Sequence, residues 1–350
     1  ESRVAMGVSV DAFLGLVRAL AAKDEPLLVM HTAALYLAAA RCDGAVSHGV
    51  LHPMVCHELV ARLRASLGAV GGRSSKPTSK RATADKPDVA LSADFKAARS
   101  AVLTELASLL EHVPLRSHPE VLSQFVSLLV SMVPSCAITA NDESSLGALA
   151  HCLHARPGDA SHTTPIVFRS LVPPLSLNIE GAPSSKEAAA AQMACADFIA
   201  TVCHSADAST TDGRALLHAA QAAMQHASAA APERAEPRAA VCASLARLLR
   251  CLPPVCTSRY ASFLWSYSRN AKVAARVFAT DMAAAMLGSA VHSTALRLPE
   301  VVGVLWRLIT HRLDDRVALV RGRALTALAA VITVGPSLLG LAQEPVPVAA

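Results

Sequence analysis

The sequence predicts an all-α protein built from stacked helical hairpins, and three observations support this prediction. Hydrophobic residues make up 53% of the 350 residues, whereas aromatic residues make up only 3%. Alanine and leucine favour helices, and the β-branched and aromatic residues that favour strands are sparse. Apolar residues also recur at helical spacing, and this pattern repeats along the chain after a series of arginines.

Four arginines are each followed by a largely apolar stripe at offsets of three, four, seven, ten and eleven residues. Residues at these offsets lie on one face of an α-helix. The four are Arg99, Arg238, Arg276 and Arg321. The stripe of the last copy, which we expect to face the core, consists of Ala324, Leu325, Leu328, Val331 and Ile332.

The spacing of the arginines predicts the type of helical array. Arg276 stands 38 residues after Arg238, and Arg321 stands 45 residues after Arg276. This period is typical of HEAT and armadillo arrays, in which each unit is a helical hairpin. Asn270 and Asp315, six residues before two of the arginines, are good helix-capping types. We therefore predict a HEAT- or armadillo-like α-solenoid. Each arginine should stand near the start of a hairpin's second helix and pair with a carboxylate of the neighbouring hairpin.

The remaining elements follow from composition along the chain. Segment 68–91 is basic, contains glycine and proline, and has no apolar periodicity, which predicts disorder. Segment 134–186 is punctuated by prolines, so we expect irregular structure with short helices there. The predicted order is N-terminal helical hairpins at 1–67, the basic insertion at 68–91, a helical hairpin at 92–133, the proline-rich segment at 134–186, HEAT-like repeats at 187–334 and a C-terminal tail of the fragment at 335–350.

The motif content argues against an enzyme. The sequence contains no phosphate-binding loop, dinucleotide-binding glycine motif, nucleophile elbow or Cys-x-x-Cys pair, so we expect no catalytic residue and no cofactor. His48, His52 and Cys56 are spaced by four, but Pro53 begins a helix between them and breaks their common face. A second group, at 151–154, lacks a fourth ligand. We therefore predict no metal site, and we interpret the nine single cysteines as reduced core residues of an intracellular protein.

A membrane span is also not expected. Residues 324–342 are uncharged for 19 positions, which is close to membrane-spanning length. Gly335 and Pro336 interrupt this stretch, and the helical stripe that precedes them ends there.

Basic residues at predicted turns and in the insertion are candidates for DNA-phosphate contacts. The net charge is only +5, so a solvated basic rim remains the alternative interpretation. Thr164 precedes a proline in a predicted loop and is a possible phosphorylation site. Trp265 lies off the main apolar stripe and either packs between repeats or serves a partner groove. The phosphate-contact candidates are Arg259, Arg269 and Lys272 near the turns, and Arg73, Lys76, Lys80 and Arg81 in the insertion.

Three stretches resemble the condensin D-type HEAT-repeat subunit, in its condensin-2 form. The most specific is WSYSRNAKVAARVFATDMAAAML, at 265–287, which is similar to the family's SRN-K-x-x-x-R-x-F-x-x-D segment. HTAALYLAAARCDGAVSHGVLHP resembles an early helix with its turn, and LITHRLDDRVALVRGRALTALAAVI resembles a later repeat. The matching positions of the first stretch are Tyr267, Ser268, Arg269, Asn270, Lys272, Arg276, Phe278 and Asp281.

This resemblance implies a non-catalytic scaffold that corresponds to the N-terminal part of the family. Such a subunit binds the kleisin subunit, contacts the SMC ATPase subunits and the DNA backbone, and helps to condense mitotic chromosomes in the nucleus. The matches span residues 31–332 in the family's order, but 134–186 match poorly, and alanine replaces many bulkier core residues. The alternative is an armadillo- or HEAT-type transport or trafficking adaptor without a DNA role. An adaptor of the importin type should carry a regular Trp-Asn ladder, which the sequence does not contain.

Overall fold

The computed structural model describes residues 9–23, 25–42, 49–71, 93–112, 118–125, 128, 160–178, 185–204, 206–290, 293 and 296–334. Within these ranges the chain is all-α, without a strand, which confirms the predicted fold class. The chain divides into two compact units. The first comprises Glu1–Ser170 with Gly181–Glu187, and the second comprises Leu171–Glu180 with Ala188–Ala350.

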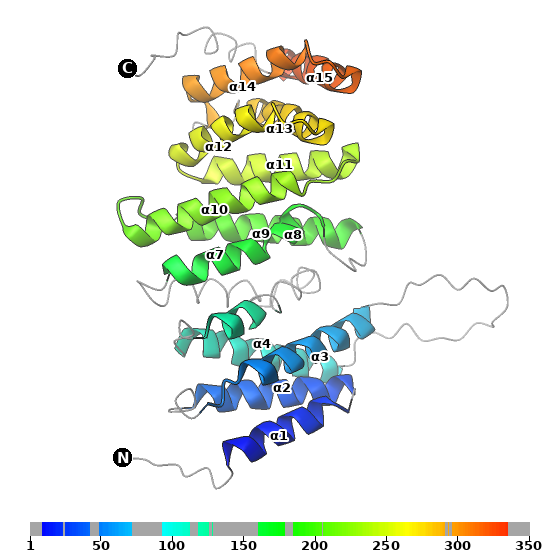
Figure 1. Ribbon diagram of the computed structural model, residues 1–350, viewed down its shortest axis with the longest axis vertical. Helices are drawn as coiled ribbons and strands as arrows, with labels where there is room; N and C mark the ends of the chain where they lie inside the picture. Colours follow the sequence, from blue (N-terminus) through cyan, green and yellow to red (C-terminus); the bar gives the residue numbers. More distant parts are fainter. Residues whose placement is uncertain are drawn as a thin grey trace, which may run out of the picture. The chain divides into compact units, whose positions relative to one another are not determined.

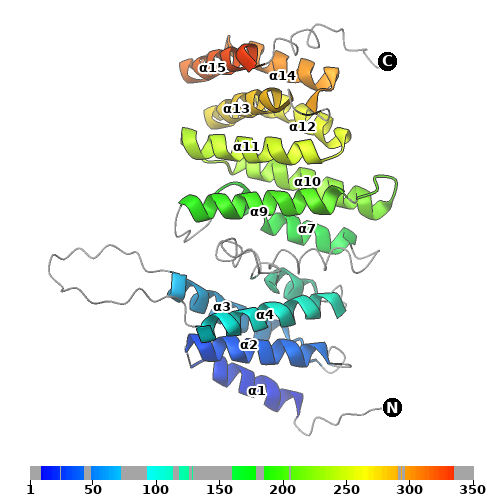
Figure 2. The same ribbon diagram turned by 180° about the vertical axis from the view of Figure 1, so that it is seen from behind.

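In the first unit, one helix packs against three others. This helix, α2 (Pro26–Arg41), contacts α1 (Val10–Ala21), α3 (Pro53–Gly71) and α4 (Ala93–His112), and its contact with α4 is visible in Figure 2. Prolines stand at the first position of α2 and α3, where their missing N–H costs no helical hydrogen bond. The buried Tyr36 of α2 binds the segment just before α3, because its hydroxyl donates to the Val50 carbonyl at 2.9 Å. The last helix of this unit is α7 (Ala160–Ser170).

The second unit contains three consecutive hairpins arranged in two layers (Figure 1). They consist of α10 (Thr211–Ala229) with α11 (Ala235–Cys251), α12 (Pro254–Tyr267) with α13 (Val273–Ala290), and α14 (Pro299–Arg312) with α15 (Ala318–Val334). The hairpins are preceded by α8 (Val172–Leu175) and α9 (Ser185–His204). Within one layer, α10 packs on α12 and α12 on α14; within the other, α11 packs on α13 and α13 on α15. This is the repeat-like arrangement that the arginine spacing predicts.

Local sequence explains where these helices begin. Prolines stand at the first position of α12 and α14. Thr210 caps α10, because its hydroxyl accepts the Gly213 N–H at 3.0 Å. The side chains of Asn270 and Asp315 accept the N–H groups of residues just before α13 and α15, as their residue types predict.

The apolar stripes that follow the arginines lie in the layer formed by α11, α13 and α15, and the prediction for one of them needs a correction. Arg238, Arg276 and Arg321 each stand as the fourth residue of their helix. The stripes after Arg238 and Arg276 are buried along their whole length. In α15, however, Leu325 is 59% exposed and Ile332 is 48% exposed, so the expectation that both face the core is wrong. The reason is that α15 packs on α13 and α14, and no other described helix covers its remaining side.

The proline-rich segment is more helical than its composition predicts in the part that the structure describes. Residues 160–178 contain α7 and α8, whereas 134–159 lie outside the described residues. Thr164 lies inside α7 with 0% exposure, even though Pro165 follows it within the helix. The prediction of an accessible phosphorylation site in a loop is therefore wrong. Pro165 is the sixth residue of α7, beyond the four N–H groups that lack a partner in a helix, so it removes one backbone hydrogen bond from the helix that contains it.

Stripe leucines of two different repeats should respond differently to truncation. We expect Leu245→Ala to lower the free energy of unfolding by about 2–5 kcal/mol, because Leu245 is fully buried. Leu325→Ala should change it by less than about 0.5 kcal/mol, because that side chain is mostly exposed and alanine is a good helix former. Urea denaturation of both variants measures the difference, and equal losses would contradict the exposure of α15.

Candidate functional site

A single carboxylate connects three successive helices of the second layer. Asp281, on α13, accepts a hydrogen bond from Nε of Arg238, on α11, at 2.8 Å. From the other side it accepts two hydrogen bonds from Arg323 on α15: Nε donates to Oδ1 at 3.1 Å, and Nη2 donates to Oδ2 at 2.9 Å. The side chains of Asp281 and Arg238 are largely removed from solvent. The ion pairs therefore fix the register of three repeats relative to one another.

A second carboxylate connects the turns of the last two hairpins. Asp315 lies 2.9 Å from Nε of Arg276 and 3.0 Å from Nη1 of Arg312, and all three side chains are buried. Nη1 of Arg276 also donates to the backbone carbonyls of Asn270 and Ala271. Arg276 therefore holds its own turn together while it binds the turn of the following hairpin.

The environment of Asp315 stabilises its charged form. Burial alone would raise the pKa of this carboxyl, but the hydrogen bond from the Val317 N–H and the pairing with Arg276 and Arg312 outweigh that effect and lower the pKa. A carboxyl with a lowered pKa contributes stability that is present above its unfolded pKa. This contribution is lost as the pH falls through the lowered value.

Arg238 and Arg276 pair across hairpins as expected. Arg238 and Arg276 each bind a carboxylate of the following hairpin. Arg99 is buried in α4, in a helix that packs on α2. Arg321 is exposed, and its Nη1 donates to the carbonyls of Asp315 and Arg316 in its own turn. No carboxylate lies within ion-pair distance of Arg321 among the described residues.

The ion pairs frame an open hollow of about 310 Å³ between two hairpin turns. We call it the turn hollow. One side belongs to the turn between α12 and α13, and the other to the turn between α14 and α15. Its lining residues are Arg269, Asn270, Ala271, Arg276, His311, Arg312, Asp314, Asp315 and Arg316.

The rim of the turn hollow carries exposed cations, one of which lies over an aromatic ring. The guanidinium of Arg269 lies 4.6 Å from the ring centroid of Trp265, a cation–π contact, and His311 meets the same ring edge-on at 5.9 Å. Arg316 and Lys272 are also exposed at these turns, where Asp314 is the exposed acidic residue. An excess of exposed cations around an open hollow is suited to binding an anion such as a backbone phosphate.

The structure separates the predicted phosphate contacts into groups. Arg269 and Lys272 share one turn, as expected. Arg259 is exposed but stands on the body of α12, ten residues before Arg269, which corresponds to about 15 Å along a helix. Its expected place at the turn is therefore wrong. The insertion candidates Arg73, Lys76, Lys80 and Arg81 lie outside the described residues.

Sequence reasoning did not identify three members of the ion network. Asp281 was noted only as part of the family-like segment, and Arg312 and Arg323 were not singled out. The available signal for Asp281 was its position five residues after Arg276, on a helix that is otherwise uncharged from there to Ala290. Its partners stand about 42 residues away in both directions, so only the stacking brings them together.

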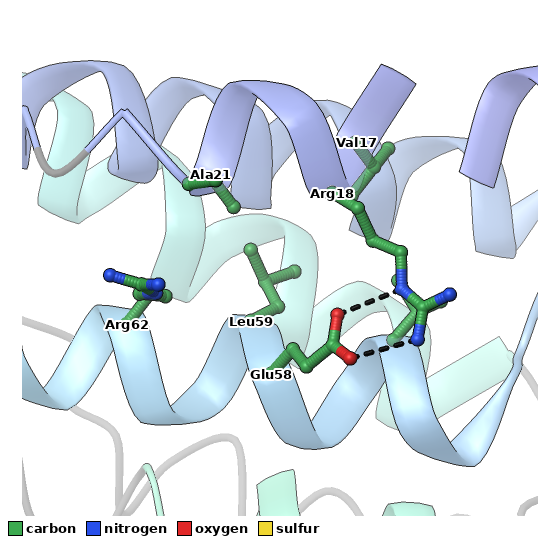
Figure 3. A pocket seen from close by; sticks show the side chains of 8 residues that line it. Val17, Arg18, Ala21, Glu58, Leu59 and Arg62 are labelled. Atoms are coloured by element: carbon green, nitrogen blue, oxygen red, sulfur yellow. Dashed lines mark hydrogen bonds and ion pairs between the residues drawn. The ribbon is translucent and has the colours of Figure 1, made fainter. Parts of the chain in front are cut away.

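The first unit has a smaller hollow of about 100 Å³ between α1 and α3 (Figure 3). Arg18 closes one end by a two-pronged ion pair with Glu58, with both nitrogen–oxygen distances at 2.8 Å. Leu59 and Val17 line the hollow between the helices. A small, largely apolar hollow whose charged groups already bind each other offers no evident ligand chemistry.

The described residues contain neither a metal-ligand cluster nor a membrane-spanning helix. Within these ranges no three His, Cys, Asp or Glu side chains gather closely enough to hold a metal ion. Of the grouped candidates, Cys56 is buried and hydrogen-bonded to Tyr36, whereas His48 and 151–154 lie outside the described residues. None of the described helices combines the length and apolarity needed to cross a bilayer.

Comparisons with known proteins leave the family of the chain open. No family model matches it, and no curated protein matches it. A solved structure of an engineered protein aligns over 92% of this chain and 89% of its own, at 12% identity and a TM-score of 0.24. A TM-score this low carries no argument about fold or function.

The Asp281 network should contribute far more to stability than an exposed ion pair. We expect Asp281→Ala to lower the free energy of unfolding by about 3 kcal/mol, because it leaves the nearly buried Arg238 without its carboxylate. The control is Arg247→Ala, which removes the exposed ion pair with Asp197 and should cost less than about 1 kcal/mol. Urea denaturation measures both, and similar small losses would show that the network does not hold the repeats together.

Proposed function

We propose that the chain is a non-catalytic helical-repeat scaffold of the condensin D type, in its condensin-2 form. In this proposal it binds the kleisin and SMC ATPase subunits, and it contacts the DNA backbone with the turn between α12 and α13. The protein would act in the nucleus, on mitotic chromosomes. ATP hydrolysis would belong to its SMC partners.

The family-like segment supports the proposal because most of its residues build the turn itself. Ser268 is buried, and Asn270 accepts the Lys272 N–H. Tyr267 packs edge-on against Phe278, with ring centroids 6.3 Å apart. Arg276 and Asp281 belong to the cross-repeat ion pairs. A chain with these residues at these positions has a turn of defined shape.

The observation that carries the DNA role is what remains exposed on that turn. Of the eight matching residues, Arg269 and Lys272 are cations whose side chains are exposed to solvent. Arg269 is already ordered by Trp265, so less conformational entropy is lost when it binds a phosphate. Arg316 adds a cation from the next hairpin at the turn hollow. Such contacts position a protein on duplex DNA without reading its sequence.

Charge reversal at the turn tests the DNA contact. We expect Arg269→Glu with Lys272→Glu to weaken binding to duplexes of any sequence, with little change in melting temperature. If both residues contact phosphates, the slope of log affinity against log salt should become shallower by about 1.8, at about 0.9 for each contact. Fluorescence anisotropy across a salt series measures this slope.

A matched control separates a local contact from the net charge of the chain. Arg250→Glu with Arg297→Glu makes the same change of charge at two exposed positions. Arg250 lies at the end of α11 and Arg297 just before α14, in connections at the opposite ends of the helices from the α12–α13 turn. This variant should bind nearly as wild type. If both double variants bind DNA with the same affinity, Arg269 and Lys272 form a solvated basic rim and not a DNA contact.

The scaffold role has its own test, because an adaptor of transport or trafficking would share the helical repeats. Affinity purification of the full chain from its native cells, followed by mass spectrometry, should recover SMC and kleisin subunits. The recovery should survive Arg269→Glu with Lys272→Glu, since those residues are assigned to DNA. Recovery of vesicle-coat proteins or nuclear-pore cargo in their place would overturn the condensin assignment and favour the adaptor.

A further inference from the structure

The buried wall of the turn hollow carries more positive than negative charge. Arg276 and Arg312 share a single carboxylate, that of Asp315. All three residues line the hollow, and each is at most 8% exposed. A buried ion needs a partner of opposite charge, because little water reaches it. Two guanidinium groups against one carboxylate leave the positive charge of the wall only partly neutralised by the protein.

The Asp281 cluster has the same composition in a different environment. Arg238 and Arg323 also share one carboxylate there. The side chain of Arg323 is 30% exposed, so water solvates its charge. The side chains of Arg276 and Arg312 are only 5% and 9% exposed, and Nε of Arg312 has no hydrogen-bond partner within the described part of the chain. The excess charge beside the turn hollow is therefore the less solvated of the two.

The rim of the turn hollow adds to the positive charge of its wall. Arg269 and Arg316 line the hollow with exposed side chains, one from each turn, and Asp314 is exposed beside them. The whole lining holds four arginines and two aspartates, which is an excess of two positive charges when His311 is neutral. An open hollow with this excess favours an anion with more than one negative charge.

The two turns also supply backbone donors. The side chains of Asn270 and Asp315 each close a small turn by accepting the N–H group two residues ahead. Ala271 and Arg316 are the residues enclosed by these turns, and both line the hollow. Their own N–H groups have no acceptor among the residues whose positions are described. Each turn thus contributes a lining residue with an unused backbone donor, as in many anion-binding turns.

We infer that the turn hollow is a binding site for a terminal phosphate group. Such a group carries about 1.5 to 2 negative charges at neutral pH and has three acceptor oxygens, so it matches the excess charge of the lining. A backbone phosphate of DNA carries one charge and would leave part of that excess uncompensated. The hollow, at about 310 Å³, lies at the lower end of the ~300–1,000 Å³ of small-molecule sites, which suits a compact ligand.

Two sources of a terminal phosphate share this chemistry, a phosphorylated serine or threonine side chain and a small phosphate compound. Arginine clusters bind both through charge-assisted hydrogen bonds. The inference goes beyond the DNA contact and does not rest on it. That contact is assigned to Arg269 and Lys272, and Lys272 is not a lining residue of the hollow.

A nuclear magnetic resonance titration of the full chain tests the site. The probes are N-acetyl-O-phosphoserine amide, inorganic phosphate and dimethyl phosphate, whose single charge imitates the DNA backbone. The first two should shift the backbone amide resonances of Ala271 and Arg316 with one shared dissociation constant. Dimethyl phosphate should bind about tenfold more weakly or not at all, because it loses a charge-assisted hydrogen bond.

The order of affinities identifies the source of the phosphate. Tighter binding of the phosphoserine amide than of inorganic phosphate assigns the ligand to a modified side chain, and the reverse order assigns it to a small phosphate compound. Unshifted resonances of Ala271 and Arg316, or equal affinity for dimethyl phosphate, would overturn the inference.

Two variants of exposed lining residues test the charge of the site in opposite directions. Arg316→Glu should weaken binding of the phosphoserine amide about tenfold or more, because it removes one donor and adds a negative charge. Asp314→Asn should strengthen binding, because it removes an opposing charge, and a gain of affinity cannot result from misfolding. Arg250→Glu, at an exposed position at the end of α11, is the matched control and should bind as wild type.

Unchanged affinity in both Arg316→Glu and Asp314→Asn would contradict a phosphate site in the hollow. That result would leave the DNA contact standing wherever duplex binding is lost in Arg269→Glu with Lys272→Glu. The two proposals therefore fail separately.

Discussion

The second unit depends on arginine side chains that reach from one hairpin to an acidic group in the next. An alanine-rich core is smooth and offers few large side chains to interlock, so apolar burial alone leaves the register of neighbouring helices weakly specified. Buried ion pairs add little net stability, but each is satisfied in only one alignment. Asp281 accepts arginines from both neighbouring helices of its layer and thereby fixes both alignments at once.

The same interaction shapes the candidate DNA contact. Arg276 binds two carbonyls of the turn that carries Arg269 and Lys272, and it also binds Asp315 in the next turn. The buried ion pair therefore sets the distance between two exposed, cation-bearing turns. Buried and exposed arginines are neighbours here: the buried ones hold the stack, and the exposed ones are available to a ligand.

Helix type, the stripes after Arg238 and Arg276, and the capping roles of Asn270 and Asp315 could all be predicted from sequence, because each depends on residues within a few turns of one another. The role of Asp281 could not, since its partners are about 42 residues away and only packing brings them close. The exposure of Leu325 was mispredicted for a related reason. An apolar stripe specifies that a helix can be covered, not that a neighbour lies there. Thr164 shows the converse, because a threonine before proline suggested a loop, whereas α7 contains Pro165 as its sixth residue and continues past it.

The position of Asp281 in the middle of three helices also has a mechanical consequence. If tension pulls the hairpin of α14 and α15 away from the stack, the two hydrogen bonds from Arg323 to Asp281 break. The hydrogen bond from Arg238 to Asp281 remains. Because each hairpin contacts mainly its neighbours, the remaining repeats keep their alignment when the end hairpin detaches. The hairpin of α14 and α15 can therefore detach as one step, and its Arg323 finds the Asp281 carboxylate still held by Arg238 when it returns.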